Sequence, residues 1–392
     1  MVDAENKTSL VFELKPIQAI SPSLAEILRN CPLQATISRI SGIKRFILGN
    51  PKAWLGTAYH KVLEKLWKPT DEELNDMELV EHLWTNAIDA LRQKAIVHPL
   101  NQRFATPEKW PGYYLVRACV QVRAEEVLAE QPRLQATVGP ASNLAGVLCE
   151  QRLSAMDGKL VGKPDVVMDN EIRDYKSGRI YDVTTDGLQA VKQEYVRQLH
   201  LYGHLVYEKY GYYPTRGKLL PMQGPAVKVN LDPETCAAEA AEAIKLLDSF
   251  NAKLAMSEEV SSIATPSPRV CRWCQYKAIC PAFWKGVEDS WGKELGSASV
   301  RGVLKESPAL IHNGQAFSLS VEVSAGTTAS SEVSIAPLDG EIHSQLAAFQ
   351  TSDAVRIVNL YQRRDGQLAP TPATLCFLDI DCPLFIFSNT VS

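Results

Sequence analysis

The sequence lacks any long hydrophobic run, since no stretch reaches the roughly 18 apolar residues that a membrane-spanning helix needs. It also lacks an excess of positive charge, because 41 Lys and Arg stand against 45 Asp and Glu, a formal net charge of −4. It contains no Walker-type phosphate loop and no internal repeat. These absences argue against a membrane protein, a basic nucleic-acid coat protein, a motor that hydrolyses ATP within this chain, and a repeat solenoid.

A secretory leader is not expected either, because the first residues, Met1 to Lys7, are polar and acidic. The cytoplasm is therefore the predicted compartment. In that reducing setting the nine cysteines favour metal binding or buried thiols over a disulfide framework.

The 392 residues are enough for two or three domains, and local patterns divide them into stretches. Residues 1–67 predict a short strand and two helices, the first capped by Ser21 with Pro22 at its first position. Residues 68–146 look helical, with a break near Pro111 and Gly112. Residues 147–256 predict strands, a helix, a strand pair and a helix beginning near Pro233.

The C-terminal stretch, residues 297–392, changes character and alternates in short β-like runs. Five strands are expected, with one helix over Ile342–Phe349 between the third and the fourth: Val300–Leu304, Phe317–Val323, Val333–Ala336, Ala354–Leu360 and Ala373–Leu378. This order suggests a small OB-like β-barrel, although any small β-rich domain fits as well. Its aromatics would be either stacking platforms for single-stranded DNA or core residues: Phe317, Phe349, Tyr361 and Phe377.

The chemistry concentrates between Leu160 and Lys176, where two β-like runs flank Asp169 and Asn170. This pair suits a two-residue hairpin turn. With that turn Met168 pairs with Glu171, and Asp165 faces Asp174 about 5 Å away at Cβ. Lys176, two residues beyond Asp174, points to the same face.

Two carboxylates placed so closely repel one another, and a divalent cation relieves the repulsion. Hard oxygen ligands suit Mg²⁺ or Mn²⁺. Lys176 would then assist an attacking water or stabilise negative charge on a phosphate. The alternative is a surface hairpin carrying a solvated ion pair.

A second cluster follows the Pro-rich segment at residues 265–268. Cys271, Cys274 and Cys280 have C-x2-C-x5-C spacing, and Cys31 is the natural fourth ligand. Four thiolates suit an iron–sulfur cluster or a structural zinc ion. A zinc site that uses His200 and His204 fits no finger spacing, and the other five cysteines are expected to be buried thiols: Cys119, Cys149, Cys236, Cys376 and Cys382.

Together these motifs resemble the PD-(D/E)XK nuclease superfamily, in its RecB-like branch. Gly162 to Asp165 and Asp174 to Gly178 resemble the core motif. Gly56 to Glu64 resembles the upstream helix motif, in which His60 would join the metal site. Gln198 to Tyr202 resembles the helix motif that follows the core, and Glu150 lies where the family often has an acidic residue.

The one-plus-three arrangement of cysteines resembles AddB-like iron–sulfur nucleases and the CRISPR adaptation nucleases. The resemblance implies a [4Fe–4S] cluster on Cys31, Cys271, Cys274 and Cys280, with zinc as the alternative. It implies an α/β, restriction-endonuclease-like domain over residues 1–290, a mixed sheet flanked by helices with a helical insertion at about 68–146. The OB-like domain would occupy residues 297–392.

The implied activity is metal-dependent DNA hydrolysis, on single strands or ends, by an exonuclease rather than an endonuclease. Asp165, Asp174, His60 and the backbone carbonyl of Tyr175 would hold Mg²⁺ or Mn²⁺, with Glu150 as a weaker candidate. Lys176, with Gln198 and Tyr202, would complete the catalytic set. Expected partners are DNA and a separate helicase or ATPase, in DNA repair, recombination or antiviral defence. The alternatives are a DNA-binding subunit that does not cut, and an iron–sulfur or zinc protein with a redox or scaffold role.

Overall fold

The computed structural model of the chain describes residues 10–68, 75–137, 147–168, 170–183, 189–364 and 366–387, and no side chains over 131–137. The chain forms two compact units. We call Ile17–Glu26 with Gly49–Ser249 the sheet unit, and Met1–Pro16, Ile27–Leu48 and Phe250–Ser392 the barrel unit. These units divide the chain differently from the domains 1–290 and 297–392, which stay a prediction.

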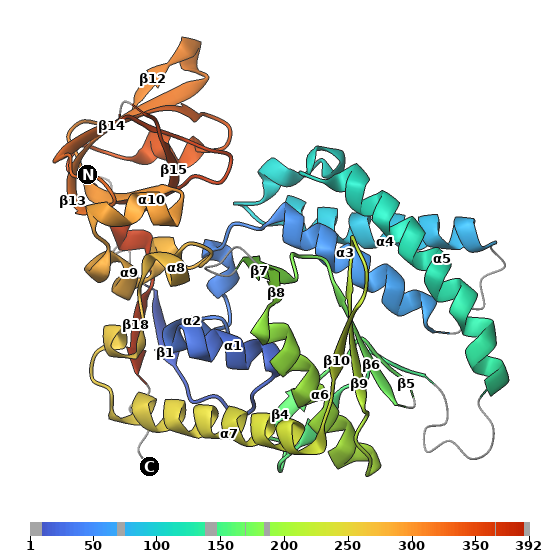
Figure 1. Ribbon diagram of the computed structural model, residues 1–392. Coiled ribbons are helices and arrows are strands. Elements are labelled where there is room, and N and C mark those ends of the chain that lie inside the picture. Colours follow the sequence, from blue (N-terminus) through green and yellow to red (C-terminus); the bar gives the residue numbers. More distant parts are fainter. Residues whose placement is uncertain are drawn as a thin grey trace. The chain divides into compact units, whose positions relative to one another are not determined.

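The sheet unit is built on a five-stranded mixed sheet in the order β10-β9-β6-β5-β2 (Figure 1). Only the β6–β9 pair is parallel. The strands are β2 (Leu148–Cys149), β5 (Val166–Met168), β6 (Glu171–Lys176), β9 (Arg216–Pro221) and β10 (Val227–Asn230). Two small hairpins accompany them: β3 (Leu153–Ala155) with β4 (Leu160–Gly162), and β7 (Tyr181–Val183) with β8 (Gln189–Val191). The predicted α/β class with a mixed sheet is confirmed.

Long helices accompany this sheet, and their starts follow the local signals. Ser21 Oγ accepts the Leu24 N–H ahead of α1, and the Asp232 carboxylate accepts the Thr235 N–H ahead of α7. Both predicted helix starts are thus confirmed. The helices are α1 (Pro22–Asn30), α3 (Pro51–Leu66), α4 (Asp76–Val97), α5 (Tyr113–Thr137), α6 (Gln193–Tyr210) and α7 (Pro233–Met256).

One core joins the helices to the sheet. The predicted apolar stripe of α3 is buried, with Tyr59 and Leu63 at 0% exposure. It packs in one cluster with residues of α4 and α5 and with Val166 and Tyr175 of the sheet. Figure 1 shows α3, α4 and α5 lying together as one group. The three helices therefore pack against one face of the strands that carry the motif residues and hold these strands in place.

The barrel unit contains a closed five-stranded barrel, in which β11 pairs with β13, β13 with β14, β14 with β16, β16 with β15, and β15 again with β11. All five expected strands are present, but the fifth one, Ala373–Leu378, corresponds to β17, which pairs with β15, whereas the ring strand β16 was not expected. The strands of this sheet are β11 (Ala298–Leu304), β12 (Ala309–Ile311), β13 (Ala316–Gly326), β14 (Glu332–Asp339), β15 (Ala354–Gln362), β16 (Leu368–Ala369) and β17 (Leu375–Leu378).

One expectation for this region needs correction. The helix over Ile342–Phe349 is only a 3-10 turn, Ser344–Ala348, because Phe349 takes an extended backbone and enters the core. Of the two alternatives for the aromatics, the core is confirmed for Phe317 and Phe349, which belong to the barrel core. Phe377 packs against Phe46 with ring centroids 6.2 Å apart, whereas Tyr361 is 57% exposed.

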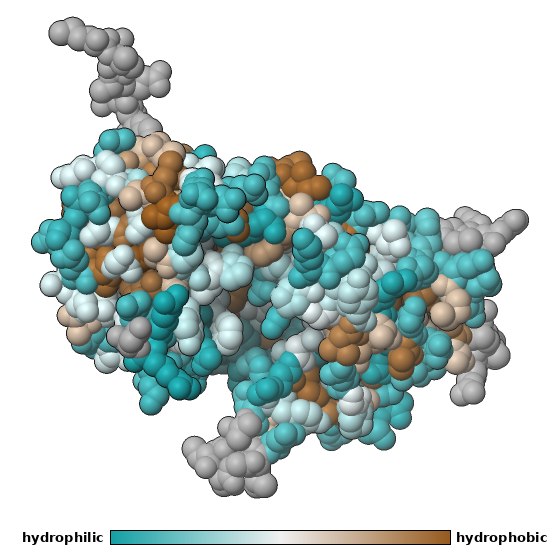
Figure 2. Space-filling view, turned by 90° about the horizontal axis from the view of Figure 1, so that it is seen from above, coloured by the Kyte–Doolittle hydropathy of each residue, from teal (hydrophilic) through white to brown (hydrophobic). Residues whose placement is uncertain are grey.

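The ends of the described chain meet in the same unit. Strand β1 (Val11–Leu14) pairs in parallel with β18 (Leu384–Phe387). Shorter helices of this unit are α2 (Pro32–Ile37), α8 (Pro268–Cys271), α9 (Pro281–Gly286) and α10 (Gly292–Leu295). None of the helices in the described ranges is both long and apolar enough to cross a membrane. On the face in Figure 2, hydrophobic residues form separate small groups among polar ones.

Candidate active site

The hairpin β5–β6 has the register that the sequence predicts. Met168 pairs with Glu171 and Val166 with Arg173, so continuation of the ladder places Asp165 opposite Asp174. Asn170 lies in the turn, and Asp169 lies outside the described residues. Because side chains alternate along a strand, Asp174 and Lys176 share one face of β6.

Asp165 has well-defined partners. Its Oδ2 accepts the Tyr175 N–H at 2.7 Å and lies 3.5 Å from His60 Nδ1 on α3. Burial opposes ionisation of Asp165, but the His60 imidazole and the Tyr175 N–H outweigh it and lower the pKa of this carboxyl. Burial likewise disfavours charged His60, yet the hydrogen bond and charge of Asp165 prevail and raise the pKa of the imidazole.

Asp174 differs from Asp165 because it is almost completely buried, at 2% exposure. Its Oδ2 lies 2.5 Å from Lys176 Nζ, but this atom has no hydrogen bond of good geometry. Burial raises the pKa of Asp174 to about 6, with Lys176 opposing the rise and Asp165 adding to it. An ionised oxygen with an unfilled bonding position is costly in such a place unless a cation compensates it.

Helix α6 fixes the position of Lys176. Lys176 Nζ donates to Gln198 Oε1 at 2.7 Å, and Gln198 Nε2 donates to the Tyr202 hydroxyl at 3.0 Å. The ring of Tyr195, one turn earlier on α6, lies 4.3 Å from the ammonium in a cation–π contact. Tyr195 is not among the residues predicted from the sequence, although its i,i+3 spacing to Gln198 places both on one helix face.

Glu150 lies beside Asp165, since its N–H donates to the Asp165 carbonyl at 3.0 Å. Its carboxylate forms an ion pair with Lys163, so it is already neutralised rather than directed at the aspartates. Glu150 has a positive φ of 52°, a strained conformation for a residue other than glycine. Burial raises the pKa of Glu150, partly offset by the Lys163 ammonium.

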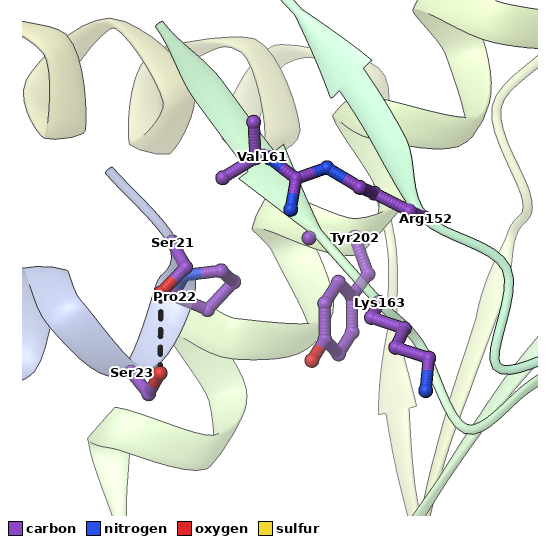
Figure 3. A pocket seen from close by; sticks show the side chains of 8 residues that line it. Ser21, Pro22, Ser23, Arg152, Val161, Lys163 and Tyr202 are labelled. Carbon is purple, nitrogen blue, oxygen red and sulfur yellow. Dashed lines mark hydrogen bonds between the residues drawn. The ribbon is translucent and has the colours of Figure 1, made fainter. Parts of the chain in front are cut away.

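A pocket of about 350 Å³ adjoins this site (Figure 3). Tyr202 and Gly162 form one side of it, and the start of α1 forms another. A Cβ on Gly162 would lie 2.5 Å from Leu205 Cδ1 and 3.0 Å from the Tyr202 ring. A glycine is therefore required before Lys163 for the tyrosine to reach its position.

The side chains present fit a divalent cation in their chemistry, although the described residues contain no group of three His, Cys, Asp or Glu that is arranged to hold a metal ion. Asp174 Oδ2, which is buried and has the Lys176 ammonium as a charged neighbour but no hydrogen bond of good geometry, is the candidate ligand atom. The Tyr175 N–H faces Asp165, and because N–H and C=O of one strand residue point to the same side, its carbonyl also faces Asp165. Two basic side chains, His60 and Lys176, lie next to the two aspartates.

The four predicted cluster cysteines come together. Cys31, Cys271, Cys274 and Cys280 line one small cavity in the barrel unit, together with the buried Lys277. Burial raises the pKa of the Cys271 thiol, and of Cys274 to about 12, so without a metal ion these thiols stay protonated. As they stand, the described residues contain no group of cysteines that is arranged to hold a metal ion.

The other five cysteines, and His204 from the zinc site that fitted no finger spacing, have ordinary surroundings. His204 on α6 is buried, and its Nδ1 hydrogen-bonds the Tyr213 hydroxyl at 3.2 Å, which is a packing role. Cys236, Cys376 and Cys382 are buried as predicted, whereas Cys119 and Cys149 are only partly buried. Partial exposure of these two corrects the expectation that all five would be buried.

A mixed sheet whose central hairpin presents two aspartates and a lysine, backed by a helix that positions the lysine, defines the class of a nuclease hydrolase. The chain belongs to the PD-(D/E)XK nuclease superfamily, because the family model of that name matches residues 19–281. Nucleases of this superfamily generally use Mg²⁺ or Mn²⁺.

Among solved structures, the chain is similar to a crystal structure from Eubacterium rectale provisionally described as an exonuclease. The two share 11% identity with a TM-score of 0.34, over 60% of this chain and 82% of the other. A similarity at this level carries no argument about activity. No curated protein matches the chain.

Proposed function

We propose that the protein is a metal-dependent deoxyribonuclease that acts on single-stranded DNA or DNA ends, as an exonuclease of the RecB-like, AddB-like branch. The observation that carries the proposal is the Asp174–Lys176–Gln198–Tyr202 chain of contacts beside Asp165. It holds a lysine next to a buried aspartate, and buried ionisable groups with a specific charged partner cluster at functional sites.

Asp165, Asp174, His60 and the Tyr175 carbonyl are the proposed ligands for Mg²⁺ or Mn²⁺, with Glu150 as a weaker candidate. When bound, such an ion polarises a phosphodiester and lowers the pKa of water. The chain's own residues would do the rest. Gln198 and Tyr195 orient the Lys176 ammonium so that it can assist the attacking water or stabilise charge on the phosphate. Tyr202 in turn holds Gln198.

For the cysteine cavity we propose a [4Fe–4S] cluster on Cys31, Cys271, Cys274 and Cys280, with structural zinc as the alternative. Four thiols from two distant segments around one cavity support a tetrathiolate site. Such a site would tie residues near 31 to those near 280 and stabilise the barrel unit. Iron and sulfide content of anaerobically purified protein, against zinc content, distinguishes the two.

We also propose that the barrel is OB-like and binds single-stranded DNA. Its strand order, with the parallel β14–β16 pair next to β15, supports this type of barrel. Tyr361, which is exposed, is the remaining stacking candidate. The proposed setting is the cytoplasm, in DNA repair, recombination or antiviral defence, with a separate helicase or ATPase as partner.

The test is cleavage of end-labelled single-stranded and duplex DNA by anaerobically purified protein with Mg²⁺, Mn²⁺ or EDTA. We expect cleavage only with a divalent ion, and a roughly 1000-fold slower rate in Lys176→Ala. Lys228→Ala, which removes an exposed charge on β10, is the matched control. Circular single-stranded DNA separates the two modes of action, because an exonuclease leaves it intact. If wild type cuts neither substrate with either ion, the proposed activity is wrong.

A further inference from the structure

The pocket beside the aspartates has the chemistry of an anion site. Among the residues that line it, five have polar or charged side chains and one is a glycine: Ser21, Ser23, Arg152, Lys163, Tyr202 and Gly162. Lys163 is paired with Glu150, whereas Arg152 has neither a hydrogen bond nor an ion pair within the described part of the chain. An unpaired guanidinium at a pocket wall is suited to a phosphate, which it can bind through two parallel hydrogen bonds.

Tyr202 adds a buried donor to the same pocket. Its hydroxyl oxygen accepts from Gln198, which leaves the hydroxyl proton free for an acceptor in the pocket. The side chain is 7% exposed, and burial, reinforced by the charge of Asp174, raises its pKa, so the proton is retained. Figure 3 shows the Arg152 guanidinium and the Tyr202 ring turned toward the Ser21 side, whereas the Lys163 ammonium points away. The pocket therefore presents donors from two directions.

The third wall is the start of α1, held in a fixed place. Ile20 N–H donates to the Lys159 carbonyl at 2.7 Å and Val161 N–H donates to the Ile20 carbonyl at 2.9 Å, which pins the residue before Ser21 to β4. Arg197 on α6 forms two hydrogen bonds with Glu26, at 2.8 and 2.7 Å. Ser21 caps the Leu24 N–H, and the Ser23 hydroxyl lies 3.2 Å from the Ser21 hydroxyl. This helix start adds a partial positive charge to the pocket.

We propose that this pocket binds one phosphate of the substrate strand, next to the phosphate that is hydrolysed. Arg152 would be its main charged contact, with the Tyr202 and Ser23 hydroxyls as neutral donors. The inference rests on the proposed function, because Tyr202 couples the pocket through Gln198 to Lys176. A filled pocket would fix the strand relative to the lysine. The phosphate is either a terminal 5′-phosphate or one inside the strand, and both have the same chemistry.

The experiment measures binding of fluorescent oligothymidine in EDTA, so that it does not depend on cleavage. The strand carries either a 5′-phosphate or a 5′-hydroxyl, and anisotropy gives Kd at several salt concentrations. We expect Arg152→Ala to weaken binding about tenfold and to lower the slope of log Kd against log salt by about one. Arg152→Lys should restore part of the affinity. Ser23→Ala should weaken binding less.

The two strands separate the sources of the phosphate. If Arg152→Ala loses affinity only for the 5′-phosphorylated strand, the pocket is a terminal-phosphate site. If it loses affinity equally for both strands, the pocket binds an internal phosphate. Lys228→Ala controls for the removal of one positive charge, and thermal melting controls for folding. If Arg152→Ala binds both strands as Lys228→Ala does, the pocket proposal is overturned, even where Lys176→Ala abolishes cleavage. If instead wild type binds through Arg152 but never cuts, the pocket proposal stands and the nuclease proposal fails.

Discussion

Substitution of Asp174 by Asn should make the metal-free protein more stable at neutral pH. The carboxyl is 2% exposed, and its pKa is raised to about 6 from an ordinary 3.8. At about 1.36 kcal/mol per pH unit this difference corresponds to about 3 kcal/mol. Asn has the same shape as the protonated acid and avoids the cost of burying the charge.

The sign of the pH dependence follows from proton binding. Between pH 3.8 and about 6 the folded state holds the Asp174 proton more tightly than the unfolded state does. The free energy of unfolding of the wild type therefore falls as pH rises through this window, and the loss is complete above it. The Asp174→Asn variant has no titrating proton at this position, so the difference in stability between variant and wild type should grow by about 3 kcal/mol over the same window.

Urea titrations of both proteins across this pH range measure the difference, with circular dichroism and tryptophan fluorescence compared to test for a single transition. Asp182→Asn, which changes an exposed aspartate on β7, is the control and should show no such trend. Mg²⁺ should stabilise the wild type and not Asp174→Asn, because ligand binding favours the folded state. A variant-minus-wild-type difference that stays constant between pH 3.8 and about 6 would refute the reasoning about Asp174.

Three further predictions concern other contacts. Gln198→Ala should lower kcat about 10- to 100-fold with little change in KM, because it frees the Lys176 ammonium, and single-turnover cleavage measures this. Tyr195→Leu should slow cleavage by about tenfold, whereas Tyr195→Phe keeps the aromatic ring and should keep the wild-type rate. If the Leu and Phe variants cleave at the same rate, the cation–π role is contradicted. Cys280→Ser should reduce bound iron or zinc and lower the melting temperature of the protein, as elemental analysis and calorimetry would show, and unchanged metal content would exclude this ligand.

Local sequence signals predicted much of the site because its geometry is local. A turn at Asn170 fixes the register of the hairpin, and the register alone places Asp165 opposite Asp174. The helix starts at Pro22 and Pro233 followed from single capping residues. Alternation along residues 297–392 likewise predicted four of the five barrel strands, but not the two-residue strand β16.

Features that depend on side-chain direction or distant pairing had no such signal. The parallel pairing of Val11 with Leu384 joins segments from opposite ends of the chain. Lys163 turns to Glu150, which sequence spacing does not reveal. Tyr195 could have been found from its helical spacing, but a tyrosine there fits core packing equally well. Phe349 follows the short 3-10 turn with an extended backbone, and its side chain lies in the core. Packing within the barrel, rather than local propensity, determines this conformation.

The arrangement around the aspartates also explains how the fold tolerates the buried Asp174 beside the partly buried Asp165 without a metal ion. Each carboxylate has a basic side chain of its own, His60 beside Asp165 and Lys176 beside Asp174. A divalent ion would have to compete with both, so its affinity should depend on the charge of His60 and on the proton of Asp174. Gln198 already holds the ammonium of Lys176 by a second contact, so the lysine keeps a defined position after it gives up Asp174. Helix α6 would thus hold Lys176 in a defined position both with and without a bound divalent ion.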